Sequence, residues 1–184
     1  YGDQHDVDLE GNVIQTTHGP EYDFEGILTT DKVIPAQAAF FRRDCFEAVG
    51  FYMDTTRITC PDYEYWVRLG TRYPMIHIPK IVAKYRWHPN SEGRQGDIIP
   101  AMVYSKIEVM KRILNDPDIP EELQKLQKIA QAGIFRWGAW SFRSNYLLWR
   151  GLKMMFRSIF TDFHPRQFTQ FSNYIYDIHD HVNP

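Results

Sequence analysis

One short stretch of the chain carries the side chains best suited to chemistry, because two acids are followed closely by a run of basic residues. Asp62 and Glu64 lie at the start of a predicted helix, and Lys84, Arg86 and His88 follow along a predicted strand. A carboxylate can remove the proton of an acceptor hydroxyl, while cations stabilise the negative charge of a departing group. The stretch therefore suggests half of an active site for group transfer to a hydroxyl.

Asp62 is the better candidate for a general base, although an acid at a helix start is also a good N-cap or first-turn residue. Such a cap is worth about 0.5–2 kcal/mol to the helix. Glu64 precedes Arg68 by four residues, the spacing of a surface ion pair on a helix. Asp62 is thus the predicted base, and Glu64 is a secondary candidate.

The basic residues also have structural alternatives. Lys84, Arg86 and, in the next loop, Arg94 could stabilise a diphosphate, but a solvated strand face and loop carry the same side chains. His88 could contact phosphate, transfer a proton or bind a metal ion, whereas a single histidine before a proline is more often structural. Both interpretations remain open from the residues alone.

Size and composition favour one domain with an extension. A chain of 184 residues can bury one sizeable core, and a net charge of -2 gives no general attraction to nucleic acid. Cys45 and Cys60 are too few for a disulfide framework, so reduced thiols in a cytoplasmic setting are expected. The sequence has no apolar run of membrane-spanning length and no signal peptide at its start. It opens at Tyr1 on a predicted strand, which suggests a piece of something longer.

Strand and helix patterns alternate in the first half. Residues 1–14 predict a β-hairpin with its turn around Gly11, and the apolar run of residues 35–42 predicts a short buried strand. Asp44 is then expected to cap a brief helix that ends at Gly50. The predicted order is hairpin, strand, helix and glycine stop.

The next two elements place the candidate residues. Apolar residues recur at helical spacing over residues 62–72, and from Met75 the period changes to the two-residue repeat of a strand. Asp6 and Asp8, in the hairpin, form an Asp-x-Asp pattern that can hold a divalent cation. Because so short a match is common on exposed hairpin arms, we interpret it as accidental.

From residue 98 onward the pattern is helical, with predicted breaks near Pro117 and between Ser144 and Asn145. Residues 123–161 contain no acid, and basic side chains alternate there with aromatic ones. Such a segment suits the surface of an anionic bilayer. It also suits a helical hairpin that packs on the core while its arginines reach solvent, which we favour slightly.

The order of these features resembles the C-terminal half of a family-2 glycosyltransferase of the GT-A fold. The matching segments are the Tyr-Gly-Asp start with its hairpin, residues 40–44, residues 49–51, residues 62–69, and residues 78–80 leading into Tyr85-Arg86-Trp87-His88 and Ser91. They cover roughly the first half of the chain. The resemblance implies an α/β fold in which residues 1–97 form part of a GT-A nucleotide-diphospho-sugar transferase domain and residues 98–184 form an α-helical extension.

The resemblance implies inverting transfer of a sugar from a nucleotide-sugar donor to a hydroxyl of a glycan or lipid-linked acceptor. Asp62 would then be the base, although the family's Glu-Asp pair is replaced here by Pro61 and Asp62. His88 matches a histidine that lies near the metal and the diphosphate in some members. Lys84, Arg86 and Arg94 would assist at the diphosphate.

Further expectations concern cofactor, partners and location. The family binds Mg or Mn through an Asp-x-Asp that precedes the Tyr-Gly-Asp segment, so this chain alone is expected to hold no tightly bound cofactor and to be inactive. A role in polysaccharide synthesis for the cell envelope would place the whole protein in the cytoplasm or at the inner face of the membrane, with no nucleic-acid partner. The alternative is a non-catalytic module that docks on a membrane or a protein through residues 123–161.

Overall fold

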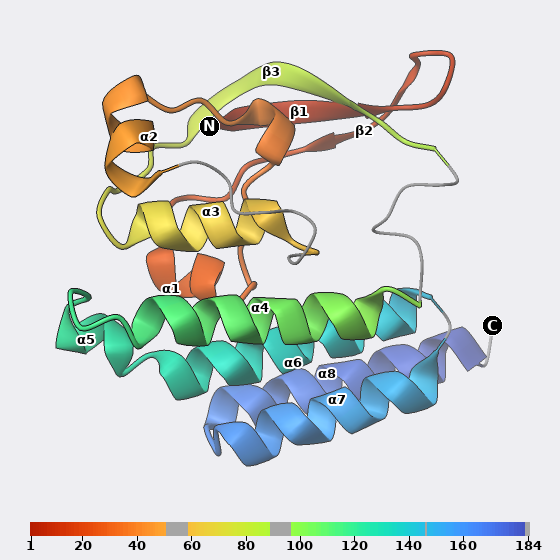
Figure 1. Ribbon diagram of the computed structural model, residues 1–184. Helices are drawn as coiled ribbons and strands as arrows, with labels where there is room; N and C mark the ends of the chain where they lie inside the picture. Colours follow the sequence, from red (N-terminus) through yellow and green to blue (C-terminus); the bar gives the residue numbers. More distant parts are fainter. Residues whose placement is uncertain (51–58, 89–96, 146, 183–184) are drawn as a thin grey trace.

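The computed structural model describes residues 1–50, 59–88, 97–145 and 147–182, with side chains up to Ile175 (Figure 1). It has a mixed α/β architecture, in which a small sheet lies above a layer of helices. Helix α3, Pro61–Gly70, runs between the sheet and the longer helices below it (Figure 1). No described helix is both long and apolar enough to cross a bilayer.

The described sheet has three strands in the order β2-β1-β3. Strands β1, Gly2–Val7, and β2, Val13–Thr17, form the predicted antiparallel hairpin. Gly11 adopts a φ of 94° in the connecting turn, a conformation that glycine reaches at little cost. Strand β3, Ile78–Arg86, pairs in parallel with β1.

The region between the hairpin and α3 contains short helices. Helix α1 spans Phe24–Leu28, η1 is a 3-10 turn at Ala36–Ala38, and α2 spans Arg43–Val49. The predicted strand at residues 35–42 is therefore wrong. The backbone N–H of Ala38 instead bonds to the carbonyl of Pro35, the i to i+3 contact of a 3-10 turn.

The predicted helix after this turn is confirmed, but its start differs. The N-cap of α2 is Arg42, because the N–H of Phe46 bonds to the Arg42 carbonyl, and Asp44 lies in the first turn. Gly50 ends the helix with a φ of 81°, as its residue type predicted.

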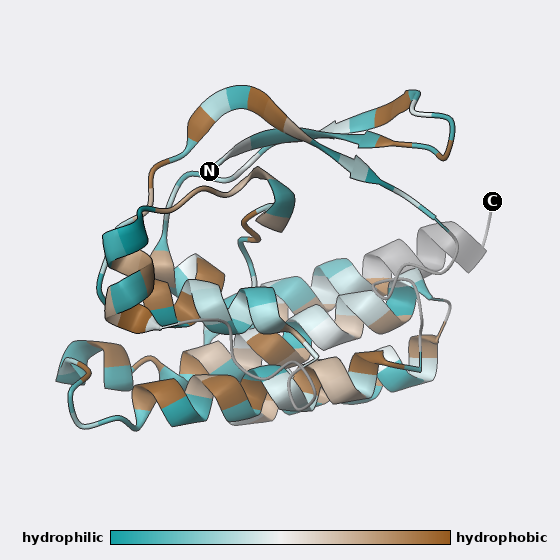
Figure 2. Ribbon diagram, turned by 45° about the horizontal axis from the view of Figure 1, so that its top comes forward, coloured by the Kyte–Doolittle hydropathy of each residue, from teal (hydrophilic) through white to brown (hydrophobic). Residues whose placement is uncertain are grey.

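The second half is helical, as predicted. Its elements are α4, Ile99–Leu114; α5, Glu121–Gln124; α6, Gln127–Ser144; α7, Leu148–Thr161; and α8, Pro165–Val182. The break between α6 and α7 falls at the predicted Ser144-Asn145 step. In Figure 2 hydrophobic and hydrophilic residues alternate along these helices.

One hydrophobic core joins the two halves of the chain. Leu28, Tyr63 and Val67 from the first half pack with buried residues of the later helices. These partners include Val103, Met110, Ile134, Phe142, Met155 and Tyr174. This core crosses residue 97, while a second cluster of Tyr1, Ile27, Ile34, Tyr65, Trp66 and Leu69 lies wholly in the first half.

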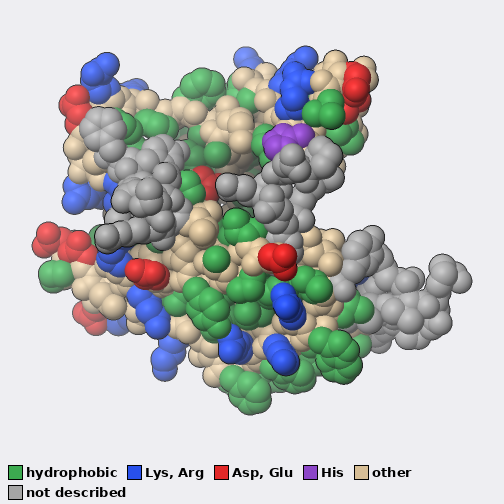
Figure 3. Space-filling view, turned by 45° about the vertical axis from the view of Figure 1, so that its right-hand side comes forward, with side chains coloured by type: hydrophobic (Ala, Val, Ile, Leu, Met, Phe, Trp, Pro, Cys, Tyr) green, Lys and Arg blue, Asp and Glu red, His purple; other side chains and the backbone are tan. Residues whose placement is uncertain are grey.

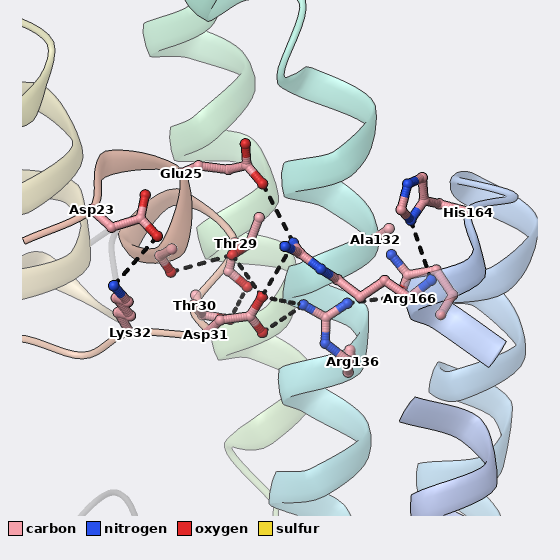
Figure 4. A network of polar contacts seen from close by, with 12 residues as sticks. Asp23, Glu25, Thr29, Thr30, Asp31, Lys32, Ala132, Arg136, His164 and Arg166 are labelled. Atoms are coloured by element: carbon pink, nitrogen blue, oxygen red, sulfur yellow. Dashed lines mark hydrogen bonds and ion pairs between the residues drawn. The ribbon is translucent and has the colours of Figure 1, made fainter. Parts of the chain in front are cut away.

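A buried arginine also joins the halves (Figure 4). Arg136 of α6 donates from Nη2 to both carboxylate oxygens of Asp31 at 2.5 Å, and from Nη1 to Gln167 at 2.7 Å. Arg166 of α8 reaches Glu25 of α1 at 3.4 Å. The expectation that the arginines of residues 123–161 reach solvent is therefore wrong for Arg136, since Asp31 offers its charge a partner inside the fold.

Candidate active site

Asp62 lies in the first turn of α3. The helix begins at Pro61 with Cys60 as its N-cap, and Oδ1 of Asp62 accepts a hydrogen bond from the backbone N–H of Tyr63 at 2.8 Å. Asp62 is thus not the N-cap, yet it satisfies one of the free N–H groups at the helix start. The side chain is half-buried, so it is neither locked in the core nor fully solvated.

A cavity of about 30 Å³ lies beside Asp62. Its lining comes from α1, the loop after it, α3 and α4, and consists of Ile27, Thr30, Lys32, Val33, Ile34, Asp62, Tyr63, Trp66 and Lys106. A space of this size accommodates about one or two water molecules. It can therefore receive a hydroxyl group but not a whole sugar ring.

Lys106 of α4 is the functional candidate that the sequence reasoning missed. Its side chain is buried, and its ammonium lies 4.2 Å from the ring centroid of Tyr63 and 4.7 Å from that of Trp137. Burial lowers the pKa of Lys106, while the neighbouring Cys60 and Asp62 act in the opposite direction. The available signal was a lysine within the apolar stripe of a predicted helix.

Glu64 has a structural role in the fold. Its carboxylate accepts from Arg68 at 2.8 and 3.0 Å and from Arg112 at 3.3 Å. Arg68 also donates to the carbonyls of Val49 and Gly50. The predicted ion pair is present, but its predicted surface location is wrong, because α4 and the end of α2 enclose Glu64 completely.

The basic residues of β3 lie apart from Asp62. Lys84 and Arg86 are exposed, and Arg86 donates to the carbonyl of Leu9 at 2.6 Å and of Asp8 at 3.3 Å. Arg86 therefore links β3 to the hairpin turn, a structural contact that neither sequence interpretation included. Arg94 lies outside the described residues.

His88 lines a different cavity from Asp62. This second space has a volume of about 510 Å³ and is bordered by the hairpin and the end of β3. Asp62 is not among the residues that line this second space. The two predicted groups therefore do not share a cavity.

The hairpin acids are engaged in local bonds. Asp6 accepts from Gln4 at 2.8 Å, Gln15 at 2.7 Å and Thr17 at 2.8 Å. Asp8 accepts from the backbone and side-chain nitrogens of Asn12 at 2.8 and 2.9 Å. Both carboxylates are thus engaged within the hairpin, although Asp6 is buried and does not lie on an exposed arm as the interpretation assumed.

The part of the chain that the structure describes offers no fitting site for the expected Mg or Mn. Within it, no three His, Cys, Asp or Glu side chains are placed to hold a metal ion. His88 as a ligand would therefore lack companions among these residues.

A second acidic group was not anticipated from the sequence. Asp3 at the start of β1 accepts from Nε2 of His77 at 2.7 Å, from Nδ1 of His18 at 2.8 Å and from the N–H of Gly19 at 3.0 Å. The bond from His77, with that from His18, lowers the pKa of Asp3 to about 2. Asp3 thereby holds together the starts of β1 and β3 and the segment after β2.

No known family model, curated protein or solved structure matches this chain.

Proposed function

We propose that this chain is the acceptor-side half of an inverting glycosyltransferase, which moves a sugar from a nucleotide-sugar donor to a hydroxyl of a glycan or lipid-linked acceptor. The observation that supports it best is the position of Asp62. Its carboxylate lies at a helix N-terminus and beside a space large enough for a hydroxyl group. The ammonium of Lys106 borders the same space.

In the proposed reaction Asp62 takes the proton of the acceptor hydroxyl. The acceptor oxygen forms a bond to the anomeric carbon while the bond from that carbon to the nucleotide diphosphate breaks, and the diphosphate leaves with the bonding electrons. Because Oδ1 of Asp62 is held by the N–H of Tyr63, Oδ2 is the oxygen assigned to the proton.

The sheet supports the proposal that a further segment completes the domain. Parallel strands are usually covered on both faces, yet Ile78, Ile81 and Val82 of β3 are exposed although β3 is parallel to β1. Figure 2 shows hydrophobic colour along this strand. An apolar hollow of about 410 Å³, lined among others by Phe40 and Ile76, lies next to β3. We assign this surface to the donor-binding half, which would also hold the Mg or Mn.

The test uses the full-length protein that contains this chain. It should release nucleotide diphosphate from one member of a panel of sugar nucleotides and transfer the sugar to an acceptor, whereas residues 1–184 alone should do neither. Turnover by residues 1–184 alone would contradict the half-domain proposal. If the full-length protein turns over none of the panel, the non-catalytic binding module becomes the better account.

A further inference from the structure

Helix α7 exposes only two kinds of side chain. Its exposed residues are the aromatic Trp149, Phe156 and Phe160 and the basic Arg150, Lys153 and Arg157. Trp149 is 80% exposed and Phe160 is 79% exposed, although both are large apolar groups. A helix surface that only meets water normally carries acidic and uncharged polar residues as well, so this composition needs another explanation.

The two kinds form separate stripes along the helix. Trp149, Phe156 and Phe160 follow one another at spacings of seven and four residues, which places them on one line of a helix. Arg150, Lys153 and Arg157 follow at spacings of three and four and form a neighbouring line. The opposite side of α7, which includes Met155 and Ile159, is buried in the core.

The aromatic stripe continues past the helix end. Phe163, in the turn after α7, is 75% exposed and contacts the partly exposed Phe168 of α8 at a ring distance of 5.0 Å. Phe156 contacts Phe171 of α8 at 5.4 Å. Figure 3 shows hydrophobic and basic side chains mixed over the lower part of the molecule, where the helical layer lies. The apolar surface is therefore contiguous over α7 and the start of α8.

We propose that this aromatic–basic face, defined as Trp149, Arg150, Lys153, Phe156, Arg157, Phe160 and Phe163, binds the surface of an anionic phospholipid bilayer. The rings enter the boundary between headgroups and acyl chains, and the cations meet lipid phosphates and carboxylates. Residues 123–161 contain no acidic residue and Asp162 is the one acid within the span of the face, which limits local repulsion from such a surface. This inference does not depend on the proposed transferase activity.

The positive charge of the aromatic–basic face favours a lipid surface over a second copy of the chain as its binding partner. A symmetric self-contact through the face would bring the same three cations against their copies without an acid from α7 to neutralise them. An anionic bilayer supplies that negative charge and an apolar layer together. We therefore assign the aromatic–basic face to binding a lipid surface.

The test is co-sedimentation of the 184-residue chain with phosphatidylcholine vesicles, with or without phosphatidylserine, in low and high salt. We expect strong binding to the phosphatidylserine vesicles in low salt and weaker binding in high salt or without phosphatidylserine. The double variant Arg150→Gln with Lys153→Gln should weaken binding to the anionic vesicles about 30-fold, because each charge is worth roughly fivefold. Trp149→Ala with Phe160→Ser should weaken binding to both kinds of vesicle at least about tenfold.

Matched controls distinguish binding through this face from the nonspecific effects of net charge and exposed apolar groups elsewhere. Lys111→Gln with Lys128→Gln removes two exposed charges from α4 and α6, and Phe40→Ser removes an exposed ring near η1. Both should bind like the parent chain, and circular dichroism confirms that every variant is folded. No binding of the parent to anionic vesicles in low salt would overturn the proposal. So would equal losses in test and control variants, or a concentration-dependent dimer that Trp149→Ala abolishes without any vesicle binding.

Discussion

Lys106 of α4 and Asp62 of α3 line one cavity, so the helical extension contributes a cation beside the acid of the first half. Because burial lowers the pKa of Lys106, its charged form destabilises the folded state, and stability rises as the folded chain loses this proton at higher pH. Lys106→Met should therefore leave the free energy of unfolding at neutral pH unchanged or raise it by about 1 kcal/mol.

The same variant should behave differently in catalysis. In the full-length protein we expect Lys106→Met to lower the transfer rate about tenfold, since Lys106 lines the space that receives the acceptor hydroxyl and its ammonium can donate to the acceptor oxygen and position it. Urea unfolding and steady-state transfer measure the two quantities. A large loss of stability with full transfer would show that Lys106 serves the fold and not the site.

Glu64→Gln tests the structural assignment of the other acid. It removes the charge of a fully buried carboxylate that binds Arg68 and Arg112, so the free energy of unfolding should fall by about 2–4 kcal/mol. Glu108→Gln, an exposed position on α4, should change it by less than about 0.5 kcal/mol. If Glu64→Gln instead keeps full stability and loses transfer, Glu64 and not Asp62 is the better candidate for the base.

Asp31→Asn tests the link between the two halves. The change leaves the buried guanidinium of Arg136 with a weaker partner, and partial exposure of Asp31 limits the cost to about 1–3 kcal/mol. Lys125→Gln breaks a pair with Glu121 whose members are both exposed, and it should cost less than about 1 kcal/mol. Thermal unfolding measures the stability of both variants. Similar losses of stability in the two would mean that the pair of Asp31 and Arg136 does not hold the two halves together.

Asp3 should account for part of the loss of folding stability at low pH. Its folded pKa of about 2 lies below the ordinary value of an aspartate, so its contribution to stability is complete above about pH 4 and disappears as the pH falls toward 2. Asp3→Asn should therefore flatten the fall of the urea midpoint across this interval, whereas Glu10→Gln at an exposed turn should not. An unchanged slope in Asp3→Asn would contradict the assignment of the low pKa.

Local signals predicted most of the elements. The turn at Gly11, the stop at Gly50 and the helical breaks follow from nearby residues. The strand predicted at residues 35–42 failed because an apolar run alone does not distinguish a strand from a 3-10 turn.

Side-chain partners were harder to predict than elements. Glu64 meets Arg112, and Asp31 meets Arg136, only after distant helices pack, so local spacing could not show that these groups are buried. The position of Lys106 beside Asp62 depends on the same packing of α3 on α4. The helix-start position of Asp62 was visible in the sequence, whereas the cavity beside it was not.

The most direct test of the proposed function is the transfer rate of Asp62→Asn in the full-length protein, measured beside its free energy of unfolding. Asparagine keeps the size of the side chain and an oxygen that can accept from the N–H of Tyr63, but it cannot take the acceptor proton. We expect the rate to fall about 100- to 10,000-fold while stability changes by less than about 1 kcal/mol. A variant that transfers sugar at the parent rate, with or without a loss of stability, would contradict the assignment of Asp62 as the base.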